Sequence, residues 1–137
     1  MVKNRQYSNH MAKILLVEDE PLVARMMEKA LKFDGFNVVV AIMGKEGLDK
    51  AKSEKPDLIL LDIMMPEPDG IEVLERLKAD EETKNIPVVM LTNLSGTHDE
   101  ELAKSKGALA YWVKKDAHPI ALGNKIKLLL EGRKGKN

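Results

Sequence analysis

Five polar residues that could do chemistry together each stand at the end of a short apolar run. They are Glu18, Asp19, Asp62, Thr92 and Lys114. Three carboxylates in one place repel one another and need a cation, and hard oxygen ligands in a half-open site favour Mg²⁺. A carboxylate can attack phosphorus, while an ammonium and a hydroxyl can hold phosphoryl oxygens. The set therefore predicts a magnesium-assisted phosphoryl acceptor, with Asp62 as the nucleophile.

These residues meet only if the apolar runs are parallel strands of one sheet, because parallel strands place their carboxyl ends at a common edge. The runs are nearly continuous, as in strands covered on both faces. Strands are predicted at 13–18, 36–41, 57–62, 86–92 and 109–114. Helices are predicted from Pro21 to a stop at Gly35, at about 44–54 and 70–79, from Thr97 to Gly107, and from Pro119.

Five repeats of strand then helix predict an α/β fold with one five-stranded parallel sheet and helices on both faces. The flavodoxin-like strand order 2-1-3-4-5 fits five strands and leaves a cleft between the first and third. Those two strands are the ones that end in Glu18, Asp19 and Asp62. The sheet order therefore predicts that these carboxylates share one cleft.

The bulk composition narrows the function classes. The chain has 137 residues, 44% hydrophobic and 32% charged, which suits one globular domain. It has no cysteine, which excludes disulfides and thiolate metal sites and fits a reducing cytoplasm. A net charge of zero argues against a dedicated nucleic-acid binder. The apolar runs are too short to span a membrane, so we expect a cytoplasmic protein.

The motifs resemble those of bacterial two-component response-regulator receiver domains, including the stand-alone chemotaxis regulator. The matching segments are ILLVEDEP at 14–21, LLDIMMP at 60–66 with Asp69-Gly70, MLT at 90–92 and YWVK at 111–114. The resemblance covers about 12–131. We therefore expect the receiver domain at 11–131. Residues 1–10 are polar and without pattern, and His10-Met11 resembles a cloning junction, so we expect 1–10 to be an added leader. Residues 132–137 are then a tail or the start of a linker.

The resemblance implies a phosphorelay switch. A sensor histidine kinase or phosphotransfer protein would donate a phosphoryl group from phosphohistidine to Asp62. Asp19 and Asp62 would ligate Mg²⁺ directly, Glu18 would act through water, and the Met64 carbonyl would be a further ligand. Beyond assisting its own phosphorylation and dephosphorylation, such a domain is not an enzyme.

The resemblance also assigns the remaining site residues. Lys114 and Thr92 would hold the phosphoryl oxygens, and Tyr111 would turn inward when Thr92 moves toward the phosphate. The expected output surface consists of the helix from Thr97, the strand 109–114 and the helix from Pro119. This surface would contact a downstream effector, an output domain outside this sequence, or a second copy in a phosphorylation-dependent dimer.

Three other functions use related chemistry or a related fold. A magnesium-dependent aspartyl phosphatase of the haloacid-dehalogenase kind needs a second aspartate two residues after the nucleophile, where this chain has Met64. A flavin-binding module needs a Ser-, Thr- or Gly-rich phosphate loop after the first strand, where this chain has Glu18 and Asp19. A non-phosphorylated receiver-like docking module remains an alternative, but the complete set of acids, threonine and lysine argues against it.

Lys115 and Asn93 are departures from the receiver pattern, as is Pro68 at a place usually taken by an apolar residue. Lys115 stands where the family has a proline after the lysine, often with a cis bond. A cis bond before a non-proline residue costs about 2.5–4 kcal/mol, so we expect a trans bond and a shifted loop. Asn93 replaces the small residue that usually follows the threonine, and it either narrows access to Asp62 or forms a hydrogen bond nearby.

Overall fold

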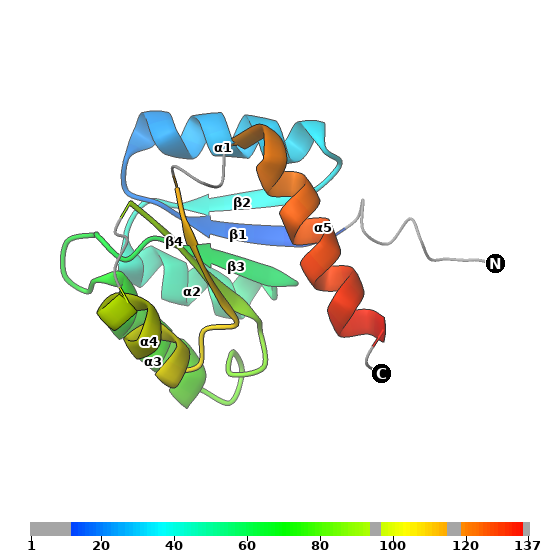
Figure 1. Ribbon diagram of the computed structural model, residues 1–137. Helices are drawn as coiled ribbons and strands as arrows, with labels where there is room; N and C mark the ends of the chain where they lie inside the picture. The colour runs from blue at the N-terminus through cyan, green and yellow to red at the C-terminus, as the bar shows by residue number, and fades with distance from the viewer. Residues whose placement is uncertain (1–11, 94–96, 115–118, 136–137) are drawn as a thin grey trace.

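The structure is a computed structural model that describes residues 12–93, 97–114 and 119–135 (Figure 1). The predictions for the leader and for Lys115 lie outside these residues. The strands are β1 Lys13–Val17, β2 Asn37–Ala41, β3 Leu58–Leu61, β4 Val88–Thr92 and β5 Ala110–Val113. The helices are α1 Pro21–Phe33, α2 Gly44–Glu54, α3 Gly70–Ala79, α4 Thr97–Ser105 and α5 Pro119–Gly135.

The five strands form one parallel sheet in the order β2-β1-β3-β4-β5, which confirms the predicted fold class. The register pairs Val17 of β1 with Leu61 of β3, so these two strands end at the same level. Glu18 and Asp62, the residues that follow, are therefore neighbours across the sheet edge.

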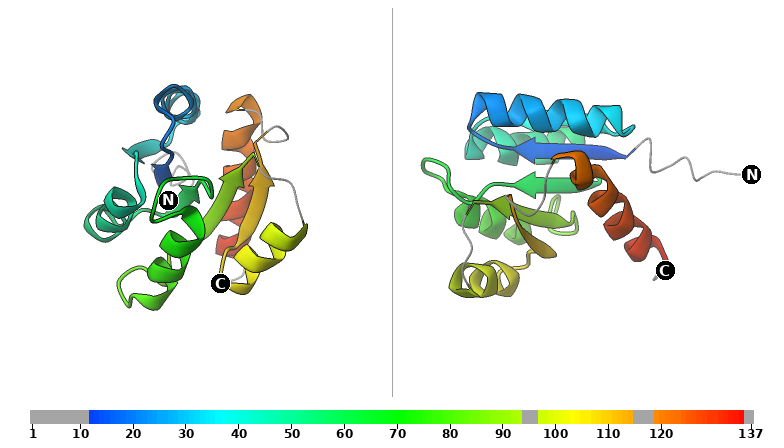
Figure 2. Two further views of the ribbon diagram at one scale, coloured as in Figure 1. Left: turned by 90° about the vertical axis from the view of Figure 1, so that its left-hand side faces the viewer. Right: turned by 45° about the horizontal axis from the view of Figure 1, so that its top comes forward.

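Helices cover both faces of the sheet (Figure 2). One core, which includes Leu15 and Ile59, packs on the side of α2, α3 and α4. The other, which includes Leu16 and Leu60, packs on the side of α1 and α5. All four residues of β3 are fully buried. This two-sided burial explains why the strand sequences are continuously apolar.

Element boundaries differ from the predictions mainly at strand ends. β1 and β3 each stop one residue before the predicted end, so Glu18 and Asp62 follow the strands directly. The helix α5 continues to Gly135, past the predicted domain limit at 131. Within the described residues, no helix is both long and apolar enough to cross a bilayer.

Candidate functional site

Three carboxylates converge at the carboxyl edge of the sheet, as the strand order predicted. Glu18 and Asp19 follow β1, Asp62 follows β3, and one oxygen of each lies within 4.8 Å of the others. Glu18 is 1% exposed and Asp62 6% exposed, while Asp19 is half-buried. We call these three residues the acidic trio. Their negative charge is concentrated where water can offset little of it.

Lys114, directly after β5, brings the opposite charge to the trio. Its Nζ donates to Glu18 Oε1 at 2.5 Å and to Asp62 Oδ2 at 3.4 Å. Its backbone N–H donates to the Thr92 carbonyl at 2.6 Å, which fixes the residue beside the end of β4. Burial alone would lower the pKa of the Lys114 ammonium. The hydrogen bond to Glu18 and the charges of both acids outweigh it and raise that pKa above its usual value.

The environment of Asp62 disfavours its charged form. Burial raises its pKa from 3.8 to about 6, and the neighbouring charge of Glu18 adds to the rise. The Lys114 ammonium and the Met64 N–H, which donates to Asp62 Oδ1 at 3.2 Å, oppose the shift only in part. The carboxylate of Asp62 is therefore less favourable here than in water, mainly because it is buried.

This donor set fits a hard divalent cation. All three members of the acidic trio offer carboxylate oxygens. Burial raises the pKa of Asp62, and a cation bound beside it would stabilise its charged form. Met64 lies in the loop after β3, its side chain 59% exposed. The role of its carbonyl as a further ligand stays a prediction.

The two predicted switch residues lie on β4 and β5, the strands that end next to this cluster. Thr92 is the last residue of β4 and is fully buried. Tyr111 is 9% exposed and belongs to the core on the side of α4. Burial raises the pKa of its phenol, and the charges of Asp99 and Glu100 in the first turn of α4 add to this. Its predicted motion on phosphorylation stays a prediction.

Glycines that hold the loop after β3 were not singled out from the sequence as positioning residues. A Cβ added at Gly70 would lie 2.2 Å from the Asp62 carbonyl oxygen, and one at Gly44 would lie 2.6 Å from the Pro68 carbonyl oxygen. Asp69 forms a reciprocal capping box with Glu72 at the start of α3. The sequence signal for this arrangement was the adjacent Asp69-Gly70 pair. Aspartate is a preferred residue at a helix N-cap, and glycine lets two backbone segments approach closely.

Comparison with known proteins identifies the same pattern. The model of the response regulator receiver domain family matches residues 14–127. The alkaline phosphatase synthesis transcriptional regulatory protein PhoP of Bacillus subtilis is 37% identical over 118 residues, which cover 86% of this chain and 48% of PhoP. The polar-differentiation response regulator DivK of Brucella ovis is 38% identical over 98 residues, covering 72% of this chain and 80% of DivK.

The chain spans about half the length of the first curated relatives, with 48%, 46% and 43% of their lengths covered. Among solved structures, a CheY-like receiver domain protein from Methanospirillum hungatei superposes with a TM-score of 0.83. The two are 28% identical, and the match covers 93% of this chain and 99% of the other. The BeF₃-activated receiver domain of Klebsiella pneumoniae RstA gives a TM-score of 0.76 at 34% identity, covering 85% and 96%.

Proposed function

Because this chain belongs to the response regulator receiver domain family of two-component systems, we propose that it is a signalling switch that accepts a phosphoryl group on Asp62. The observation that carries the proposal is the placement of a buried carboxylate between two further acids and one ammonium. Nothing in a structural ion pair requires three acids for one lysine, whereas a divalent cation and a phosphoryl group together use all four groups.

In the proposed reaction, a carboxylate oxygen of Asp62 attacks the phosphorus of a phosphohistidine. The new O–P bond forms as the N–P bond breaks, and the departing imidazole keeps the electron pair of that bond. Lys114, with Nζ 3.4 Å from Asp62 Oδ2, would hold one phosphoryl oxygen, and the Thr92 hydroxyl would hold another. A Mg²⁺ ion held by the acidic trio would offset the charge on the phosphoryl oxygens.

The donor in this proposal is a sensor histidine kinase or a phosphotransfer protein. The domain acts on no other substrate and only assists the gain and the hydrolysis of its own phosphoryl group. Added charge at Asp62 would draw Thr92 toward the phosphate and let Tyr111 settle further inward. This is a local change of charge that biases a two-state element.

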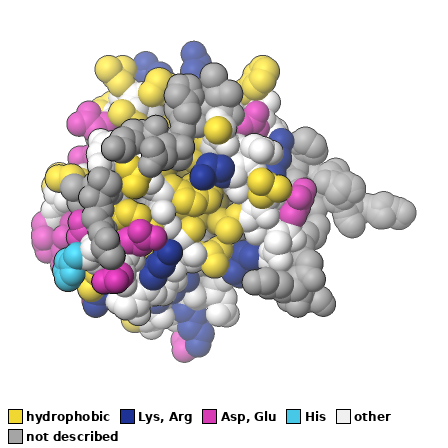
Figure 3. All heavy atoms as spheres, viewed as in Figure 1, with side chains coloured by type: hydrophobic (Ala, Val, Ile, Leu, Met, Phe, Trp, Pro, Cys, Tyr) yellow, Lys and Arg dark blue, Asp and Glu magenta, His cyan; other side chains and the backbone are white. Residues whose placement is uncertain are grey.

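The proposed output surface comprises α4, β5 and α5. On the face shown in Figure 3, hydrophobic side chains gather over β5 between α4 and α5. Leu109, just before β5, is 39% exposed, and Trp112 and Val113 are half-buried. Apolar side chains gathered on one face of the molecule suit a protein partner. Under the proposal that partner is an effector, an output domain or a second copy of this chain.

The test is phosphorylation of the purified protein by acetyl phosphate in Mg²⁺. We expect one added phosphoryl group by intact mass, lost in base, together with a change in the fluorescence of Trp112. Removing Mg²⁺ with EDTA should prevent the labelling. Asp62→Asn should abolish both signals, whereas Asp57→Asn, the same change just before β3 and far from the site, should preserve them. Labelling that survives Asp62→Asn would overturn the proposal.

A further inference from the structure

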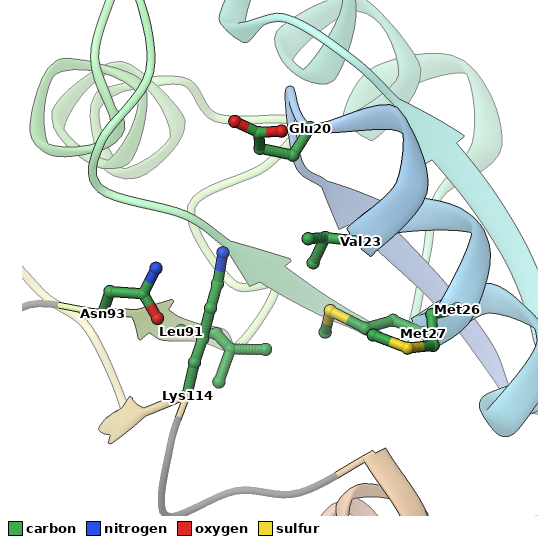
Figure 4. A pocket seen from close by; sticks show the side chains of 7 residues that line it. All are labelled: Glu20, Val23, Met26, Met27, Leu91, Asn93 and Lys114. Atoms are coloured by element: carbon green, nitrogen blue, oxygen red, sulfur yellow. The ribbon is translucent and has the colours of Figure 1, made fainter.

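A pocket lies beside the acidic trio, between α1 and the ends of β4 and β5 (Figure 4). Its volume is about 310 Å³. The residues that line it are Glu20, Val23, Met26, Met27, Leu91, Asn93 and Lys114. This volume is at the lower end of the range for small-molecule sites, so the pocket can hold one ring or a short aliphatic group.

The lining of this pocket is mainly apolar. Val23, Met26 and Met27 come from α1, and Leu91 comes from β4 on the opposite side. Methionine side chains adapt to the shape of a ligand, and their sulfur atoms make favourable contacts with aromatic rings. Apolar walls with two methionines therefore favour a ring or another apolar body over a strongly hydrated group.

The charged side chains near the pocket determine whether it attracts a positively or a negatively charged ligand. Among the described residues at this edge, Glu18, Asp19, Glu20 and Asp62 carry four carboxylates and Lys114 carries the ammonium that pairs with them, which leaves three negative charges in excess. Of these five residues, Glu20 and Lys114 line the pocket itself. Lys114 is already shared by Glu18 and Asp62. A cation is therefore attracted to this edge of the sheet and an anion is repelled.

Glu20 is the acid that a ligand in the pocket can reach. Its side chain is exposed at one end of the pocket, with Met26 and Met27 at the other (Figure 4). Its carboxylate makes no ion pair or hydrogen bond with any other residue that the structure describes. It also lies outside the acidic trio, so it stays available when a metal ion occupies the trio.

We propose that this pocket binds a small apolar cation, such as an aromatic amidine or amine, with the Glu20 carboxylate as its counter-ion. The ring would contact Met26 and Met27, and the charged group would face Glu20. Because Lys114 forms part of the wall, the bound cation would lie next to the phosphoacceptor site. The binding itself requires no phosphorylation, so it can be tested independently of the proposed function.

The direct test is NMR of the full chain labelled at the methionine methyl groups, with each signal assigned by a single Met→Leu replacement. Three probes share one shape: benzamidine is cationic, benzamide neutral and benzoate anionic. We expect benzamidine to shift the signals of Met26 and Met27 with a Kd on the order of 1 mM. Benzamide should bind more weakly, and benzoate should leave the signals unchanged.

A matched pair of variants tests the counter-ion. Glu20→Gln should weaken benzamidine binding about three- to fivefold, the usual worth of an exposed ion pair. Glu28→Gln is the control, because Glu28 lies on α1 outside the pocket and pairs with Lys32 at 2.8 Å. Equal weakening in both variants would overturn the assignment of Glu20.

Two further outcomes would overturn the pocket itself. Equal binding of benzoate and benzamidine would remove the charge argument, and shifts at the exposed Met43 and Met64 instead of Met26 and Met27 would place the ligand elsewhere. Binding should also persist in saturating Mg²⁺. Its complete loss there would place the benzamidinium group among the acidic trio rather than against Glu20.

Discussion

Replacing Asp62 by asparagine should stabilise the fold at neutral pH, although it removes the proposed nucleophile. The folded protein raises the pKa of this carboxyl from 3.8 to about 6, mainly through burial. Ionising it therefore costs more in the folded than in the unfolded state, by about 1.4 kcal/mol for each of roughly two pKa units. Asparagine is uncharged, so Asp62→Asn should raise the free energy of unfolding at pH 7.5 by about 3 kcal/mol.

The pH dependence of unfolding independently tests whether Asp62→Asn stabilises the fold. Between pH 4 and 6 the folded protein holds the proton of Asp62 more often than the unfolded chain does, so the wild type loses stability as the pH rises. The cost of ionising Asp62 is absent below the pKa that this carboxyl has in the unfolded chain. It is complete above the pKa that it has in the folded protein. Urea unfolding followed by circular dichroism should therefore show a higher free energy of unfolding for Asp62→Asn than for the wild type at pH 7.5, and almost no difference at pH 3.5.

The control is Asp49→Asn, which makes the same chemical change at a side chain that is 70% exposed. It should alter stability by less than about 0.5 kcal/mol at either pH. Added Mg²⁺ should stabilise the wild type more than Asp62→Asn, because ligand binding to the folded state adds to its stability. An Asp62→Asn variant that is less stable than wild type at pH 7.5 would refute the reasoning.

Three other substitutions test how the site is held. Lys114→Gln removes the ammonium from the buried Glu18 and should cost about 3 kcal/mol in urea unfolding at pH 7.5, part of which Mg²⁺ should restore. Gly70→Ala forces a methyl group against the Asp62 backbone and should cost about 3 kcal/mol and slow acetyl-phosphate labelling. Asp69→Ala removes the cap of α3 and should cost about 1 kcal/mol in unfolding, with the labelling rate nearly unchanged.

The fold and the convergence of the acids were predictable because they depend on pattern and topology. Continuous apolar runs identified the strands, and alternation with helices required parallel pairing. Once the strand order was set, Glu18, Asp19 and Asp62 had to meet at one edge. The limits of α2 and α3 also match the prediction. Pro56 prevents α2 from continuing, and the Asp69-Gly70 pair marks the start of α3.

Contacts that depend on distances between segments were not predictable in this way. The sequence suggested Lys114 as a ligand for phosphoryl oxygens, but its shorter hydrogen bond to Glu18 depends on how far β5 lies from β1. The tight approach of Gly70 to Asp62 depends on the path of a loop. The pocket beside Glu20 likewise depends on the gap between a helix and strands that are distant in the sequence.

The pairing of Lys114 with Glu18 joins residues 96 positions apart and has a consequence for synthesis. During translation the chain grows from its amino end, and an early portion can collapse before the rest is made. The acids at the ends of β1 and β3 then emerge well before the lysine that balances them. A nascent chain that ends before β5 would fold with the carboxylates of the acidic trio repelling one another. The proposed phosphoacceptor site should therefore become able to accept a phosphoryl group only when β5, the edge strand, packs onto the sheet.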